Sequence, residues 1–167
     1  MENRITNTTH LNAKKVLSAN FLKNKFITIC YAVLTVIFLC LAAYDMFKAG
    51  EGYLAEVTVH VSFAFISIVF AVVIPLFSSY SWARKAKREF GSSTVQVDYQ
   101  FTDINLRLIY DGKTIDKFDY RNIYKTITKK NMFVIIGDRK LFIIDIDGFK
   151  KANDLEKIEA YIKRFTK

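Results

Sequence analysis

Residues 26–44 read FITICYAVLTVIFLCLAAY, a run of 19 residues without a charged side chain. A second uncharged run of 27 residues extends from Val57 to Ala83. An α-helix rises about 1.5 Å per residue, so about 20 apolar residues cross the roughly 30 Å hydrocarbon core of a bilayer. Both runs reach that length, whereas buried helices of soluble proteins are usually shorter and keep a polar stripe. The sequence therefore predicts a transmembrane hairpin over residues 26–83.

The hairpin divides into a first span at about residues 26–47, an external loop at about 48–56 and a second span at about 57–83. Pro75 is expected to kink the second span, because proline lacks the amide hydrogen that the helix needs there. His60 lies near the outer end of this span, with no other histidine near it in the sequence, and is expected to be an incidental polar residue. Two helices cannot enclose a pore without oligomerising, so conduction by a monomer is disfavoured and a homo-oligomer is left open.

Basic residues are unevenly distributed around the two runs. Residues 1–25 carry five lysines and arginines, the loop at 48–56 carries only Lys48, and a basic collar of four follows the second run: Arg84, Lys85, Lys87 and Arg88. Positive residues near the ends of spans remain cytoplasmic. Both termini are therefore predicted to face the cytoplasm.

The composition of the whole chain excludes several classes of protein. Among its 167 residues, 51% are hydrophobic and the formal net charge is +9, which rules out a disordered tail. Two cysteines supply no disulfide framework. Nucleic-acid binding would need exposed aromatic residues among the basic ones, or a reading helix, and neither pattern occurs. The expected partners are the lipid bilayer and an unidentified protein, with no nucleic acid.

The N-terminal segment, residues 1–25, is predicted to be cytoplasmic and largely helical. Apolar residues from Leu11 to Leu22 recur at intervals of three to five, with lysines between them, as in an amphipathic helix. The first six residues or so could add a strand to the other cytoplasmic part.

From residue 92 to residue 167 the pattern changes to short alternating runs. Val95–Phe101 alternates, 104–110 follows, and Asp111-Gly112 is a two-residue hairpin signal. About six short strands at this spacing predict an antiparallel barrel or sandwich. Leu155, Ile158 and Ile162 then line one face of a closing helix that would plug the mouth of the barrel. The expected fold class is α+β: a transmembrane hairpin plus a small antiparallel domain of pleckstrin-homology-like (PH-like) type.

Three segments of this region carry a resemblance to a known family. They are FDYRNI at residues 118–123, MFVII at 132–136, and LFII at 141–144 ahead of Gly148-Phe149. With this layout the chain resembles the YcxB-like bacterial membrane proteins, which have a PH-like C-terminal domain. The family usually has a Pro-Lys-aromatic pattern at the last turn, where this chain has DIDGF at residues 145–149. The resemblance implies a multi-pass protein of the bacterial inner membrane.

The motifs of common enzymes and cofactor sites do not occur in the sequence. A phosphate-binding glycine loop, a nucleophile elbow and zinc spacings are all missing. Asp145-x-Asp147-Gly148 resembles the start of a calcium loop, but Phe149 and Lys150 stand where such a loop needs an oxygen ligand and a glycine. No catalytic residue, cofactor or metal is therefore predicted, and the protein is not expected to be an enzyme.

Basic residues are the remaining candidates for a site. The collar and the turn residues Lys129 and Lys130 could contact anionic lipid headgroups, although a solvated positive flank also explains the collar. A binding or scaffold protein is the leading functional hypothesis. A membrane immunity or stress-defence protein against a membrane-active peptide is the alternative, and an enzyme or transporter subunit is a third, less favoured class.

Overall fold

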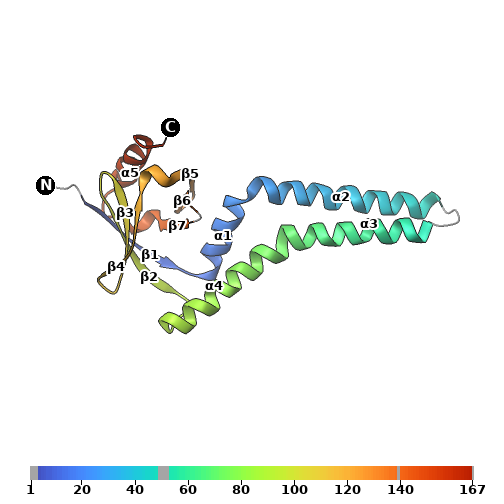
Figure 1. Cartoon of the computed structure of the whole chain (residues 1–167), viewed down its shortest axis with the longest axis horizontal. Coiled ribbons are helices and arrows are strands. Elements are labelled where there is room, and N and C mark those ends of the chain that lie inside the picture. Colours follow the sequence, from blue (N-terminus) through green and yellow to red (C-terminus); the bar gives the residue numbers. More distant parts are fainter. Residues whose placement is uncertain (1–3, 49–52, 139, 167) are drawn as a thin grey trace. The chain divides into compact units, whose positions relative to one another are not determined.

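The computed structural model describes residues 4–48, 53–138 and 140–166 (Figure 1). The chain forms two compact units. One takes in the described parts of residues 1–19 and 83–167, called here the β unit, and the other takes in those of residues 20–82, called here the hairpin unit. Residues 49–52 of the predicted external loop lie outside the described residues.

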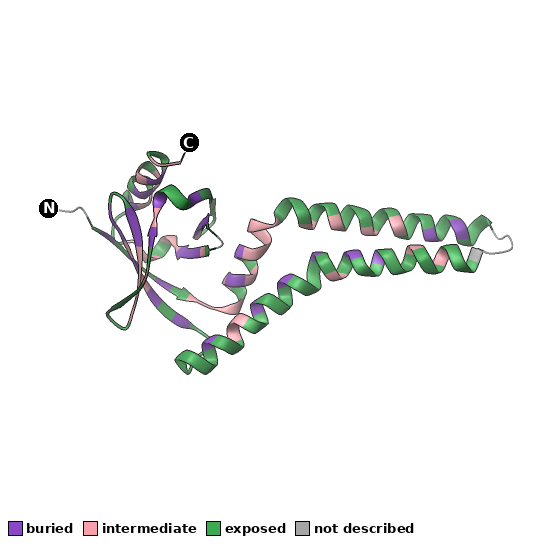
Figure 2. Ribbon diagram, in the orientation of Figure 1, coloured by how far each residue is buried: buried purple, intermediate pink, exposed green. Residues whose placement is uncertain are grey.

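Two long antiparallel helical stretches form the hairpin unit. They are α2 (Lys25–Lys48) and a continuous stretch made of α3 (Tyr53–Ile68), a π-helical turn (Val69–Val73) and the first part of α4 (Ile74–Phe90). Ring contacts join them, with Tyr31 stacked on Phe70 and Phe38 on Phe63, each at 5.2 Å between centroids. Both stretches are long and apolar enough to cross a membrane. Most of their apolar side chains are exposed, as Figure 2 shows.

A π-helical turn lies directly before Pro75, the residue at which the sequence predicts a kink. The turn spans Val69–Val73, and α4 resumes regular winding at Ile74. Proline removes one backbone donor, and a locally wider turn is a common way to accommodate such a defect. Ser79 Oγ donates to the Pro75 carbonyl oxygen at 3.1 Å, an additional bond within this part of the helix.

The β unit contains two antiparallel sheets. The first has the strand order β1 (Ile5–Leu11), β2 (Val95–Phe101), β3 (Asn105–Tyr110) and β4 (Lys113–Asp119). The second has the order β5 (Ile123–Lys129), β6 (Met132–Gly137) and β7 (Lys140–Asp145). The unit also contains α5 (Asp154–Lys163) and the part of α1 (Ala13–Lys23) up to Ala19. The prediction of an α+β chain with short antiparallel strands is thus confirmed.

The prediction left a barrel or a sandwich open, and the two sheets do not close into a barrel. Within the described residues no ladder joins β4 to β5, and β1 forms one isolated bridge, Asn7 to Phe149, with the segment that follows β7. A short 3₁₀ turn, Tyr120–Asn122, leads the chain from the first sheet to the second. Residues 92–167 contain six strands, as predicted. The added N-terminal strand spans residues 5–11, farther along the chain than expected, and α1 begins only at Ala13.

Aromatic and branched side chains from both sheets form the core of the β unit. The Phe118 and Phe142 rings lie 5.0 Å apart between centroids, and Tyr99 meets Phe142 edge-on at 6.5 Å. Full burial of such a side chain contributes about 1.5–3 kcal/mol. The closing helix α5 buries Ile158 and Ile162 against this core, while Leu155 is only half-buried.

The hairpin unit is inserted between two neighbouring strands of one sheet. Strands β1 and β2 pair over their whole length, from Ile5 opposite Phe101 to Leu11 opposite Val95. The chain between Leu11 and Val95 therefore leaves the sheet and returns to it at the same end. Strand β1 belongs to the four-stranded sheet, so residues 92–167 alone would lack one edge of that sheet.

Candidate functional site

Alternation along β1 places two polar side chains inside the β unit. Residues 5, 7 and 9 of ITNTTHL face inward, and Asn7 and Thr9 are 1% and 0% exposed. Both bond to the end of β7: Asn7 Nδ2 donates to the Asp145 carbonyl oxygen at 2.7 Å, and the Asp145 amide donates to Thr9 Oγ1 at 2.9 Å. Buried polar groups need such partners. Side chains rather than a backbone ladder therefore hold β1 beside β7.

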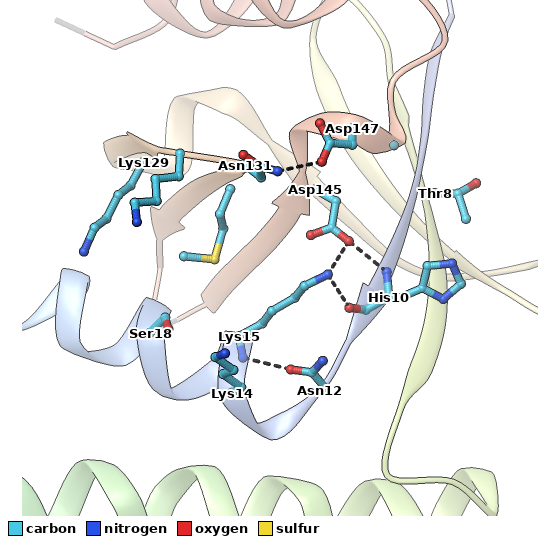
Figure 3. Close-up of a pocket in the computed structure, with 13 residues that line it drawn as sticks. Thr8, His10, Asn12, Lys14, Lys15, Ser18, Lys129, Asn131, Asp145 and Asp147 are labelled. Atoms are coloured by element: carbon cyan, nitrogen blue, oxygen red, sulfur yellow. Dashed lines mark hydrogen bonds and ion pairs between the residues drawn. The ribbon is translucent and has the colours of Figure 1, made fainter.

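The same aspartate binds the start of α1 through its carboxylate. Lys15 Nζ lies 2.5 Å from Asp145 Oδ2 and donates to the His10 carbonyl oxygen at 2.8 Å, while the His10 amide donates to Asp145 Oδ2 at 3.2 Å. Asn12 caps the helix, because its Oδ1 accepts from the Lys15 amide at 3.0 Å. Figure 3 shows Lys15 reaching from α1 to Asp145. The first turn of α1 is thus tied to β7.

The turn between β5 and β6 lies next to the segment that follows β7. Lys129 pairs with Met132, leaving Lys130 and Asn131 as the two turn residues. Asn131 Nδ2 donates to Asp147 Oδ2 at 2.8 Å, and the Ile146 amide donates to the Asn131 carbonyl oxygen at 2.9 Å. These two bonds fix the turn against the 3₁₀ segment that follows β7 (Ile146–Gly148).

Together these elements border an open groove with a volume of about 850 Å³, called here the lysine pocket, in which Lys14, Lys129 and Lys130 are exposed. Its charged lining consists of four lysines and two aspartates, namely Lys14, Lys15, Lys129, Lys130, Asp145 and Asp147. Both carboxylates accept bonds from neighbouring groups, as described above. Within the described residues, Lys14, Lys129 and Lys130 form no ion pair. The pocket therefore has an excess of uncommitted positive charge.

The structure separates the two groups of basic residues that the sequence singled out. Lys129 and Lys130 line the pocket, whereas the collar lies on α4 and contributes no residue to the lining: Arg84, Lys85, Lys87 and Arg88. Within α4, Lys85 and Glu89 form an exposed ion pair at 3.9 Å. Such pairs contribute little to stability. The collar and the turn are thus two separate features.

Lys14 and Lys15 also line the pocket. In the sequence they serve only as positive charges that indicate the orientation of the first apolar run. Residue 15 lies 130 positions before its partner Asp145, so no local pattern indicates that they meet. The only local signal is Asn12, a helix-capping residue just ahead of the two lysines.

His60 does not stand alone, contrary to expectation. Its Nδ1 lies 2.7 Å from Oδ2 of Asp45, and the Phe38 ring stacks on the imidazole at 6.2 Å between centroids. Asp45 is buried between the two helical stretches of the hairpin. The pair joins α2 to α3, fifteen residues apart in sequence, near the end of the hairpin where the chain turns.

Other ionisable groups of the β unit are buried or form local hydrogen bonds. Burial raises the pKa of Tyr99 and of Tyr120 well above the usual tyrosine range, and Tyr120 Oη donates to the Thr102 carbonyl oxygen at 2.9 Å. On the surface, hydrogen bonds from Arg121 lower the pKa of Asp119. Among the described residues, no group of three or more histidines, cysteines and carboxylates is placed to hold a metal ion.

A smaller cavity of about 360 Å³ also has a basic lining, with Lys150, Lys151 and Lys157 beside Asp154. The lysine pocket is the candidate site because it is the larger of these two and contains Lys129 and Lys130. Neither the search of protein-family models nor the search of curated proteins finds a match to this chain. Its function is therefore inferred from the geometry.

Proposed function

We propose that this chain is a membrane-anchored binding or scaffold protein. A two-helix transmembrane hairpin would display the β unit on the cytoplasmic face of the bacterial inner membrane, without catalytic activity. The observation that carries the proposal is the outward apolar surface of the hairpin unit, where Phe26, Phe65 and Phe77 are each more than half exposed. Water would make such a surface costly, at about 25 cal/mol per Å² of apolar area, whereas lipid tails would cover it.

The pairing of β1 with β2 supports the proposed topology. Because Leu11 and Val95 are paired, both connections to the hairpin start at one end of one sheet. A chain with two spans returns to the side from which it left. The excess of basic residues on both flanks favours the cytoplasm as that side.

A PH-like assignment and membership of the YcxB-like family remain part of this proposal. Two small antiparallel sheets followed by the amphipathic helix α5 fit the architecture that the resemblance implies. The β unit would act by binding, either to lipid headgroups of the inner leaflet or to a protein partner.

Site-directed labelling in intact cells tests the anchor and its direction. Cys30 and Cys40, the native thiols, are first replaced by alanine. Single cysteines are then introduced at Lys48, at the outer end of α2, or at Thr126, an exposed residue of β5. A membrane-impermeant maleimide should label Lys48→Cys in intact cells and Thr126→Cys only after permeabilisation.

The opposite pattern, or labelling of both cysteines in intact cells, would contradict the topology. Extraction of the protein by alkaline carbonate, which leaves membrane-spanning proteins in the bilayer, would contradict the anchor itself.

A further inference from the structure

We propose that the lysine pocket binds the phosphate group of a phosphate ester, carried by a lipid headgroup or by a soluble molecule. This inference deepens the proposed function and rests on it only for the position of the pocket near the inner leaflet. The pocket itself is built entirely from the β unit.

Charge is the main reason. Lys15 is neutralised by Asp145, whereas Asp147 keeps its negative charge because its partner, the Asn131 amide, is neutral. Lys14, Lys129 and Lys130 form no ion pair among the described residues, so the four lysines and two aspartates leave the lining with a net positive charge. Like charges gathered around one groove repel each other, and a bound anion removes that repulsion. A phosphate group brings about two negative charges and several strong acceptor oxygens near neutral pH.

The N-terminal end of α1 adds to the same preference. Asn12 and Lys14 line the pocket, so the first turn of an 11-residue helix borders it. The positive end of the helix dipole favours an anion at this position. The three lysines and the helix start thus act in the same direction.

Size defines the class of ligand. Inorganic phosphate alone would fill little of a groove of about 850 Å³. Pockets for small organic ligands range from about 300 to 1,000 Å³. An organic group attached to the phosphate would therefore occupy the remaining space.

Residue-resolved chemical modification of lysines tests the proposal on the full chain. The protein is placed in phosphatidylcholine nanodiscs and treated with an amine-reactive reagent, and mass spectrometry reports the rate at each lysine. One arm adds glycerol 3-phosphate, and the other adds phosphatidic acid to the discs. Sodium chloride at matched ionic strength is the control for screening.

Protection of Lys14, Lys129 and Lys130, with none at Lys113 on β4, supports the pocket. Protection by glycerol 3-phosphate identifies a soluble ester as sufficient, and protection by phosphatidic acid alone identifies a lipid headgroup. Equal protection at Lys113, or protection in neither arm, overturns the proposal.

A pair of double variants with the same net charge separates the pocket from general attraction. Lys129→Gln with Lys130→Gln should weaken binding of the protecting probe by about thirtyfold, at about 1 kcal/mol for each lysine. Lys113→Gln with Lys117→Gln changes two exposed lysines of β4 that do not line the pocket and should leave affinity nearly unchanged. Equal losses in the two variants, or no loss in either, overturn the proposal.

The two proposals fail in different ways. Cytoplasmic labelling of Thr126→Cys without lysine protection would remove the pocket and keep the anchor. Lysine protection by glycerol 3-phosphate with external labelling of Thr126→Cys would remove the proposed topology and keep the pocket.

Discussion

Phenylalanine has opposite surroundings in the two units of this chain. Phe26 of the hairpin unit is 78% exposed, whereas Phe133 of the β unit is 0% exposed. In the β unit, apolar side chains lie against one another and exclude water. In the described part of the hairpin unit many large apolar side chains are exposed, and the buried apolar residues are small ones such as Ala42 and Ala64.

The two units differ in what surrounds their apolar side chains. The β unit makes its own core, and its stability should respond to changes of single core side chains. If the hairpin unit spans a membrane as proposed, lipid supplies its apolar environment, and its outward side chains should tolerate exchange among apolar residues. A substitution that affects both units equally would contradict this division.

The largest effect is expected for Phe133→Ala in the middle of the second sheet. Removal of a fully buried ring should lower the free energy of unfolding of the β unit by about 3–5 kcal/mol, because a cavity remains. Hydrogen exchange of the β6 amides in the full chain, in detergent micelles, measures this loss. Phe77→Ala, at an outward position of the hairpin, is the matched control and should leave the same amides unchanged.

The closing helix offers a comparison within the β unit. Ile158 is fully buried, so Ile158→Ala should cost about 2–5 kcal/mol. Leu155 is half-buried, and Leu155→Ala should cost about half as much, since part of its surface already meets water. Thermal unfolding of the full chain in micelles measures both. Equal losses would show that α5 packs differently from the structure.

Gly148 tests the packing of β1 against the 3₁₀ segment that follows β7. A Cβ added there would lie 2.2 Å from the Thr8 carbonyl oxygen, so either strand β1 or the 3₁₀ segment would have to move. Gly148→Ala should therefore cost about 1–3 kcal/mol and accelerate hydrogen exchange in β1.

Gly112→Ala is the control for this prediction. Gly112 has a φ of +72° with open space around it, so the substitution strains only the β3–β4 turn. Unchanged exchange in β1 for Gly148→Ala would contradict the close approach.

Periodicity and composition predict most of the elements but not how they meet. Local sequence patterns predict the two long helical stretches, the Asp111-Gly112 turn and helix α5. The structure has each of them at the predicted place. Strand β1 carries Asn7 and Thr9 at its buried positions, so its inward face has no apolar alternation that could be recognised.

The lysine pocket depends on contacts across the whole chain. Lys15 meets Asp145, and Asp45 meets His60, through side chains that no local pattern connects. Lys129 and Lys130 are site candidates from the sequence because the positive-inside rule does not require their charges. Lys14 and Lys15 are not, because that rule already accounts for positive residues ahead of the first apolar run.

The smallest expected effect is at Lys130, whose backbone lies in the left-handed region that is unfavourable for lysine. A left-handed backbone costs a lysine about 1–2 kcal/mol, and glycine avoids this cost but loses about 0.5–1 kcal/mol through its freedom in the unfolded chain. Lys130→Gly should therefore be more stable than the parent by up to about 1 kcal/mol, as measured by thermal unfolding of the full chain in micelles. Lys130→Gln removes the same charge and keeps the strained backbone, so a gain confined to the glycine variant would come from the backbone. Stability of Lys130→Gly below that of Lys130→Gln would contradict the strain. A gain in stability together with weaker protection by the phosphate ester would show that this turn is shaped for binding at the expense of folding.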